Sequence, residues 1–159
     1  MGSVSKAIRL ISSWDSSGGF CIQEAYNFFR VKGPKRQWVA VVWSSCITPK
    51  YAFILWVCAK SKLQTKDRLH YLDIDSMCPL CRAGEESVQH LFFQCTFSAT
   101  VWGHIRAWLG ISRAMSTIAS ALKWIKKEGW GTSWRSKMKR IALAYSVFQI
   151  WNAWNRMIF

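Results

Sequence analysis

Residues 78–95 read CPLCRAGEESVQHLFFQC and hold three cysteines and one histidine. The spacing is C-x2-C-x8-H-x4-C, with Cys78, Cys81, His90 and Cys95 as its members. A C-x2-C turn can direct two thiolates at one ion, and three Cys with one His complete a closed tetrahedral set. For an isolated C-x-x-C, buried thiols would be the simpler interpretation. Four ligands in so short a segment favour structural zinc.

The same stretch predicts a helix with a break in it. Glu85–Ser87 is typical of a helix N-terminus, with the serine as cap and two acids at the positive end of the dipole. Cys95 follows His90 by five residues, which is about 500° around a regular helix and leaves the two about 140° apart. We therefore expect the helix to break near Gln94, so that both side chains reach one ion.

The residues before this stretch also predict helices. An amphipathic helix begins after Gly18-Gly19, places Ile22, Ala25, Tyr26 and Phe29 on one face, and ends at Gly33-Pro34. Residues 38–43 fit a short helix or a buried strand equally well. Thr48 and Pro49 suit the N-cap and first position of a helix reaching about Lys62, and Thr65 can cap a shorter one over 66–73.

The residues after Cys95 predict three more helices. The first carries Phe97, Val101, Ile105, Trp108 and Leu109 in helical register and ends at Gly110. The second is a basic amphipathic helix within 116–131. The third, residues 133–159, is long and amphipathic, with this inward face expected: Trp134, Met138, Ile141, Tyr145 and Phe148. Beside that face lie Ala144, Val147, Trp151, Trp154 and Ile158. We expect a mainly α, small helical domain built around one Cys3His zinc module.

The chain of 159 residues is strongly basic, with a net charge of +14. Such an imbalance favours an anionic partner, RNA or DNA, held through phosphates with low sequence specificity. A solubilising surface is the plain alternative. Two clusters are the candidate contacts: Lys60, Lys62, Lys66 and Arg68; and Lys123, Lys126, Lys127, Arg135, Lys137, Lys139 and Arg140.

The cysteines and the N-terminal residues indicate the cellular compartment in which we expect the protein. Residues 1–17 hold no signal-peptide core, so we expect an intracellular protein, nuclear or cytoplasmic, with organelle targeting a weaker alternative. The longest apolar run, Tyr51–Ala59, is far short of the ~20 residues that span a bilayer. Cys21, Cys46 and Cys58 are expected as core thiols, and His70 and His104 lack partners at metal spacing.

Four stretches of the sequence together resemble one protein family. They are GGFCIQEAYNFF (18–29), VVWSSCITPKYAFILWVCAKSKLQTKDRL (41–69), the cysteine-rich stretch with TFSATVW, and IALAYSVFQIWNAWNRMIF (141–159). These stretches, in this order, resemble the reverse-transcriptase zinc-binding domain of plant LINE-type, non-LTR retrotransposons. The resemblance implies that Cys78, Cys81, His90 and Cys95 are the zinc ligands, and that Leu91, Phe92, Val101 and Trp102 form the apolar framework.

The resemblance also implies an accessory role in nucleic-acid engagement. No polymerase YADD-type motif is found, so we expect a stand-alone domain, a transposon relic or a domesticated host gene, and not an enzyme. The expected divisions are an N-terminal tail (1–13), the zinc-binding domain (14–110), and a basic segment with the C-terminal aromatic helix packed on it (111–159). The alternative function is a protein-interaction or self-association module that uses the aromatics of FQIWNAWNRMIF (148–159).

Overall fold

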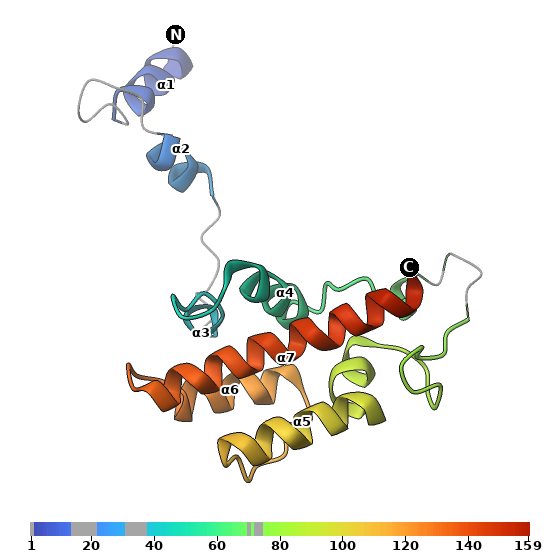
Figure 1. The fold of residues 1–159 in the computed structure, drawn as a ribbon. Coiled ribbons are helices and arrows are strands. Elements are labelled where there is room, and N and C mark those ends of the chain that lie inside the picture. The colour runs from blue at the N-terminus through green and yellow to red at the C-terminus, as the bar shows by residue number, and fades with distance from the viewer. Residues whose placement is uncertain (1, 14–21, 31–37, 70, 72–74) are drawn as a thin grey trace. The chain divides into compact units, whose positions relative to one another are not determined.

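The computed structural model of the chain describes residues 2–13, 22–30, 38–69, 71 and 75–159, in two compact units, Met1–Lys35 and Arg36–Phe159 (Figure 1). The first unit contains α1 (Gly2–Ser13) and α2 (Ile22–Phe29). Helix α2 confirms the helix predicted there, while its expected glycine and proline boundaries lie outside the described residues. The predicted divisions at residues 13 and 110 stay predictions.

The second unit begins with short helices. Residues 38–43, for which a helix and a strand were both open, form the short helix α3 (Val39–Val42). Helix α4 (Pro49–Ala59) begins with Pro49 at its first turn as predicted, because its fixed φ suits a position that needs no N–H. It ends before the expected Lys62. Of the helix expected over 66–73, the described residues contain a single 3-10 turn, η1 (Lys66–Arg68), and residues 70 and 72–73 lie outside the described part of the chain.

The remaining elements are η2 (His90–Gln94), α5 (Thr96–Leu109), α6 (Ile118–Glu128) and α7 (Trp134–Ile158). Local signals set their ends. Gly110 adopts a left-handed conformation with φ 64° at the end of α5, as predicted. Thr117 and Ser120 form a reciprocal capping box at the start of α6. The described residues thus form a mainly helical domain without strands, apart from one isolated bridge between Met77 and Glu85.

Helix α7 is the long C-terminal helix that the periodicity predicted, and it organises the second unit. Its 25 residues extend over roughly 37 Å. It contacts α4, α5, α6 and η2, and Figure 1 shows it crossing the unit between α4 and α5. On the α4 side, the ring of Tyr51 packs on Tyr145 and Phe148, with centroids 5.5 Å and 4.7 Å away. The helix is therefore covered on more than one side.

The inward face predicted for α7 is confirmed only in part, because Met138, Ile141 and Phe148 are half-buried but its other two members are exposed. Trp134 is 74% exposed and Tyr145 is 44% exposed. The buried residues form a different stripe: Ser136, Ala142, Leu143, Ala144, Ser146, Val147, Ile150 and Trp154. At 100° per residue the two stripes lie about 180° apart. A helix packed on several sides carries apolar residues around much of its circumference, and small residues at the core face let neighbouring helices approach closely.

The face predicted for α5 is confirmed in part, because Val101, Ile105 and Leu109 are half-buried. Phe97 and Trp108 are exposed, whereas Ser98 and Trp102 are buried.

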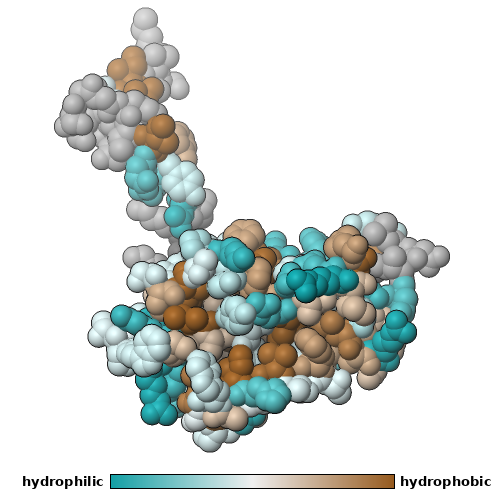
Figure 2. Space-filling view, in the orientation of Figure 1, coloured by the Kyte–Doolittle hydropathy of each residue, from teal (hydrophilic) through white to brown (hydrophobic). Residues whose placement is uncertain are grey.

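Among the described residues, no helix has both the length and the apolar character required to cross a membrane. Apolar and hydrophilic residues are interleaved on the visible face of the second unit (Figure 2).

Candidate metal centre

The first two candidate ligands lie in a reversing loop. Its base is closed by the Met77–Glu85 bridge, whose two backbone hydrogen bonds run from Glu86 N to the Ser76 carbonyl and from Cys78 N to the Gly84 carbonyl, both 2.9 Å. At its tip, Arg82 N donates to the Cys78 carbonyl over 2.8 Å. Arg82 takes φ 50°, an uncommon value for a residue with a Cβ. The loop thereby turns back around Cys78 and Cys81.

The other two ligands lie on a helix that breaks where the ligand spacing requires it. Ser87 Oγ accepts a hydrogen bond from His90 N over 3.0 Å, which confirms the predicted cap. Residues His90–Gln94 then form a π-turn, and Cys95 N donates to the His90 carbonyl five residues back. Cys95 itself is extended, with ψ 133°, and α5 starts at Thr96. The break predicted near Gln94 is confirmed.

The structure brings the four predicted ligand atoms together. All of them lie within 4.8 Å of one another. Cys81 Sγ is 3.2 Å from His90 Nε2, and Cys78 Sγ is 4.0 Å from Cys95 Sγ. Zinc bonds of about 2.3 Å to sulfur and 2.0 Å to nitrogen in a tetrahedron place the donors of a Cys3His set roughly 3.5–3.8 Å apart. The donor set and its spacing therefore fit a tetrahedral metal ion, with His90 binding through Nε2.

The thiols of this cluster differ in acidity. Burial raises the pKa of Cys78 to about 12, and the neighbouring Cys95 thiol adds to the effect. Burial also acts to raise the pKa of Cys81, but the backbone N–H of Ala83 and the contact with His90 outweigh it and lower the value to about 7. A bound metal ion keeps its cysteine ligands as thiolates, so binding must release the proton of Cys78.

Side chains outside the ligand set hold the π-turn in place. A π-turn that ends at a helix terminus leaves carbonyls without partners in the helix. Ser98 Oγ donates to the Leu91 carbonyl over 2.5 Å, and Trp102 Nε1 donates to the Phe92 carbonyl over 2.6 Å. Leu91 and Phe92 are fully buried. The buried residues of α5 thus connect the ligand segment to the next helix.

Glu86 has a role that its sequence position did not suggest. The prediction placed it as one of two acids at the positive end of a helix dipole, and the structure shows it buried. Its Oε1 accepts from Lys66 N over 2.8 Å and its Oε2 accepts from Trp154 Nε1 over 2.6 Å. Burial raises its pKa, against the lowering effect of these hydrogen bonds. No local signal could reveal this, because Trp154 is 68 residues away in the chain.

The remaining thiols and histidines stay outside the cluster. Cys58 is buried, and burial raises its pKa to about 12, as expected of a core thiol. Cys46 is half-buried, and its Sγ lies 3.3 Å from Ser44 Oγ. His104 is exposed. Cys21 and His70 lie outside the described residues.

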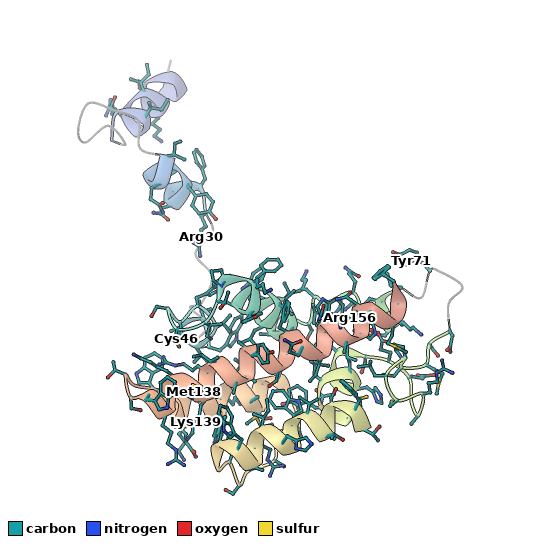
Figure 3. All side chains as sticks on the ribbon, viewed as in Figure 1. Arg30, Cys46, Tyr71, Met138, Lys139 and Arg156 are labelled. Carbon is teal, nitrogen blue, oxygen red and sulfur yellow. The ribbon has the colours of Figure 1, made fainter. Side chains whose placement is uncertain are left out.

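The structure gathers the larger basic cluster onto two adjacent helices. Lys123, Lys126 and Lys127 are exposed on α6, and Arg135 and Lys137 are exposed on α7. Lys139 and Arg140, among others, already have partners within the chain. Lys139 Nζ lies 3.7 Å from Glu128 Oε2 and 5.0 Å from the centre of the Trp124 ring, and Arg140 Nη2 donates to the Gly131 carbonyl over 2.8 Å. Figure 3 labels Lys139 towards the N-terminal end of α7.

The smaller basic cluster is divided. Lys60 follows Ala59, which lines a hollow together with α6 residues. Lys66 instead donates from Nζ to the Met77 carbonyl over 2.8 Å, and it lines another hollow at the C-terminal end of α7. Lys62 and Arg68 are exposed.

The alternative function, a protein-interaction module, assumed that the aromatic residues of the C-terminal helix are uncovered. This is wrong for Trp154, which is 2% exposed and stacks on Trp151 with ring centroids 4.5 Å apart.

Comparison with known proteins agrees with this geometry. Residues 20–102, more than half of the chain, match the family model described as zinc-binding in reverse transcriptase. A relative from Arabidopsis thaliana, named "Putative ribonuclease H protein", is 23% identical over 100 residues, which cover 59% of this chain and 16% of the relative. No solved structure matches. The chain therefore belongs to the family of zinc-binding domains of reverse transcriptases.

Proposed function

We propose that the chain is a zinc-binding and nucleic-acid-binding accessory domain derived from a retrotransposon polyprotein, without polymerase or nuclease activity. The observation that carries the proposal is the Cys3His cluster, whose ligand atoms lie within 4.8 Å of one another in a chain of this family. Zinc is the metal that such a tetrahedral thiolate and imidazole set prefers. When bound, it would hold the loop of Cys78 and Cys81 against the π-turn.

The same coordination argues for a structural site. Three thiolates and one imidazole fill a tetrahedron and leave no position for a water molecule that the ion could activate. We therefore expect no hydrolysis of RNA or DNA by the purified protein.

Metal content tests the first part of the proposal. Protein purified without chelator should contain one zinc ion per chain, measured by elemental analysis. Cys81→Ser or His90→Ala should lower the zinc content and the stability, since structural zinc contributes on the order of 10 kcal/mol to folding. Cys46→Ser is the matched control, because this thiol lies outside the cluster. Zinc-free wild-type protein would refute the proposal.

Charge supports the second part. The net charge is +14, and the exposed cations of α6 and α7 form the largest basic group. Phosphate contacts release counterions, so affinity for an oligonucleotide should fall steeply as salt is raised. Contacts of this kind carry no base information, and binding should depend little on sequence.

A pair of matched variants locates the nucleic-acid contacts. The first changes Lys123, Lys126 and Lys127 to Gln; the second changes Lys62, Arg68 and Arg156 to Gln. All six residues are exposed, and both variants lose the same charge. We expect the first to weaken binding and to reduce its salt dependence more than the second. The reverse result would move the site away from α6. Binding that survives high salt would argue for apolar docking instead.

A further inference from the structure

Helix α6 separates two hollows of different chemistry. Both are lined by Ala119 and Lys123, which lie one helical turn apart on its exposed side. We call the first the Trp38 hollow; it has a volume of about 330 Å³. We call the second the Arg113 hollow; it has a volume of about 370 Å³. Lys123 therefore lies between the two hollows and can contact a ligand in either one.

The Trp38 hollow combines an aromatic ring with an apolar lining. The half-buried indole of Trp38 lies there with the side chains of Ala59, Ile118 and Leu122, and Lys123 and Lys126 complete the lining. Aliphatic and indole surfaces favour a flat apolar group, and nucleic-acid bases offer such a face. The ammonium groups favour negative charge beside that group.

The Arg113 hollow carries more charged side chains than the Trp38 hollow, and Ala119 and Trp124 also line it. Arg113, Lys123 and Lys127 line it, with the hydroxyl groups of Thr117 and Ser120. Glu128 also lines it, and Lys139 pairs with that carboxylate over 3.7 Å. Three cations against one already paired acid suit a phosphate group.

An apolar hollow beside a cationic one matches the alternation of base and phosphate along a strand. We propose that the Trp38 hollow holds one unpaired nucleobase, while Lys123 and the Arg113 hollow hold the adjoining phosphates. The partner is then single-stranded nucleic acid, because bases in a duplex are stacked and paired and cannot enter a hollow. This inference rests on the proposed nucleic-acid binding and names the form of its ligand.

Fluorescence anisotropy with three labelled probes tests the inference on the full, zinc-loaded chain. The probes are an oligothymidine strand, an abasic strand with the same number of phosphates, and a duplex of equal length. We expect the thymidine strand to bind on the order of tenfold more tightly than the abasic strand, which is the effect of stacking one base. Equal affinity for the thymidine and abasic strands, or tighter binding of the duplex, overturns the inference and leaves phosphate binding intact. Failure of all three probes to bind at low salt refutes the nucleic-acid proposal itself.

Single-residue variants test whether the preference for the thymidine strand arises in the Trp38 hollow. Trp38→Leu should remove the preference for thymidine over the abasic strand without changing the affinity for the abasic strand. Trp43→Leu is the control, because Trp43 is exposed nearby in the chain and does not line this hollow. Ala119→Phe gives a second measurement at an exposed position, where the fold tolerates change. Because Ala119 lines both hollows, this variant should remove the preference for thymidine and also weaken binding of the abasic strand. If Trp38→Leu and Ala119→Phe both keep the preference, the base does not bind there.

Discussion

Replacing Trp154 by phenylalanine tests the connection between α7 and the metal-binding segment. The indole N–H of Trp154 donates to Glu86 Oε2 over 2.6 Å, and the other oxygen of this carboxylate accepts from Lys66 N over 2.8 Å. Glu86 follows the ligand loop directly and precedes the cap at Ser87. Phenylalanine keeps an aromatic ring in the core but removes the N–H donor.

The magnitude follows from the burial of both partners. A hydrogen bond to a charged group contributes about 1.5–3 kcal/mol, and its loss leaves a buried carboxylate oxygen without its donor. The smaller ring leaves a space that costs about 1 kcal/mol more. The free energy of unfolding should therefore fall by about 3 kcal/mol. That is a large share of the roughly 5–15 kcal/mol that stabilise a typical domain.

Urea unfolding of the zinc-loaded protein, followed by circular dichroism, measures this loss. Transfer of zinc to a chelator should also be faster in Trp154→Phe, because the loop and the cap are then less firmly held. Trp134→Phe is the matched control on the same helix, since this side chain is exposed and should change stability by no more than about 0.5 kcal/mol. If the two variants unfold alike, the buried hydrogen bond does not stabilise the domain and the reasoning fails.

Three further predictions concern single residues. Since burial raises the pKa of Glu86 above its unfolded value, its contribution to stability is present below the unfolded pKa and is lost as pH rises through the folded pKa. The unfolding free energy of the wild type minus that of Glu86→Gln should fall from about pH 4 upwards, and a rising difference would contradict a buried carboxyl with a raised pKa. In Gly84→Ala the new Cβ would lie 3.2 Å from His90 Cε1, so zinc should transfer to a chelator several-fold faster; Gly103→Ala, whose Cβ meets nothing within 4 Å, should transfer zinc at the wild-type rate. Gly110→Ala should cost about 1 kcal/mol in thermal unfolding, because φ is 64° there, and an unchanged melting temperature would contradict a left-handed helix end.

The local features of this protein were predictable from the sequence. The spacing of Cys78, Cys81, His90 and Cys95 predicted a common site, and helix geometry alone required the break at Gln94. The start of α4 at Pro49 and the end of α5 at Gly110 followed from single turn residues. In each case the physical cause acts over a few residues of chain, so the sequence displays it directly.

The packing of α7 could not be predicted in the same way. Periodicity showed that residues 133–159 form one helix, but apolar residues on several sides left the core face open, and the stripe of Trp134 and Tyr145 was the wrong choice. Large aromatic residues dominate the hydrophobic periodicity, so they drew the predicted core face towards Trp134 and Tyr145. The core face is instead set by Val147 and Ile150 together with small residues, because neighbouring helices must approach closely there.

The sequence by itself thus determined the ligand set, most of the longer helices and the positive charge, whereas the tertiary structure decided which distant groups meet. Only folding pairs Glu86 with Trp154, seats Trp102 on the π-turn, and places Trp38 beside Lys123. The first and third of these contacts join segments far apart in the chain, and the second joins the π-turn to α5. A buried polar group must find a partner, but its chemistry does not specify which of many distant donors will supply it, so only the packed fold identifies the partner.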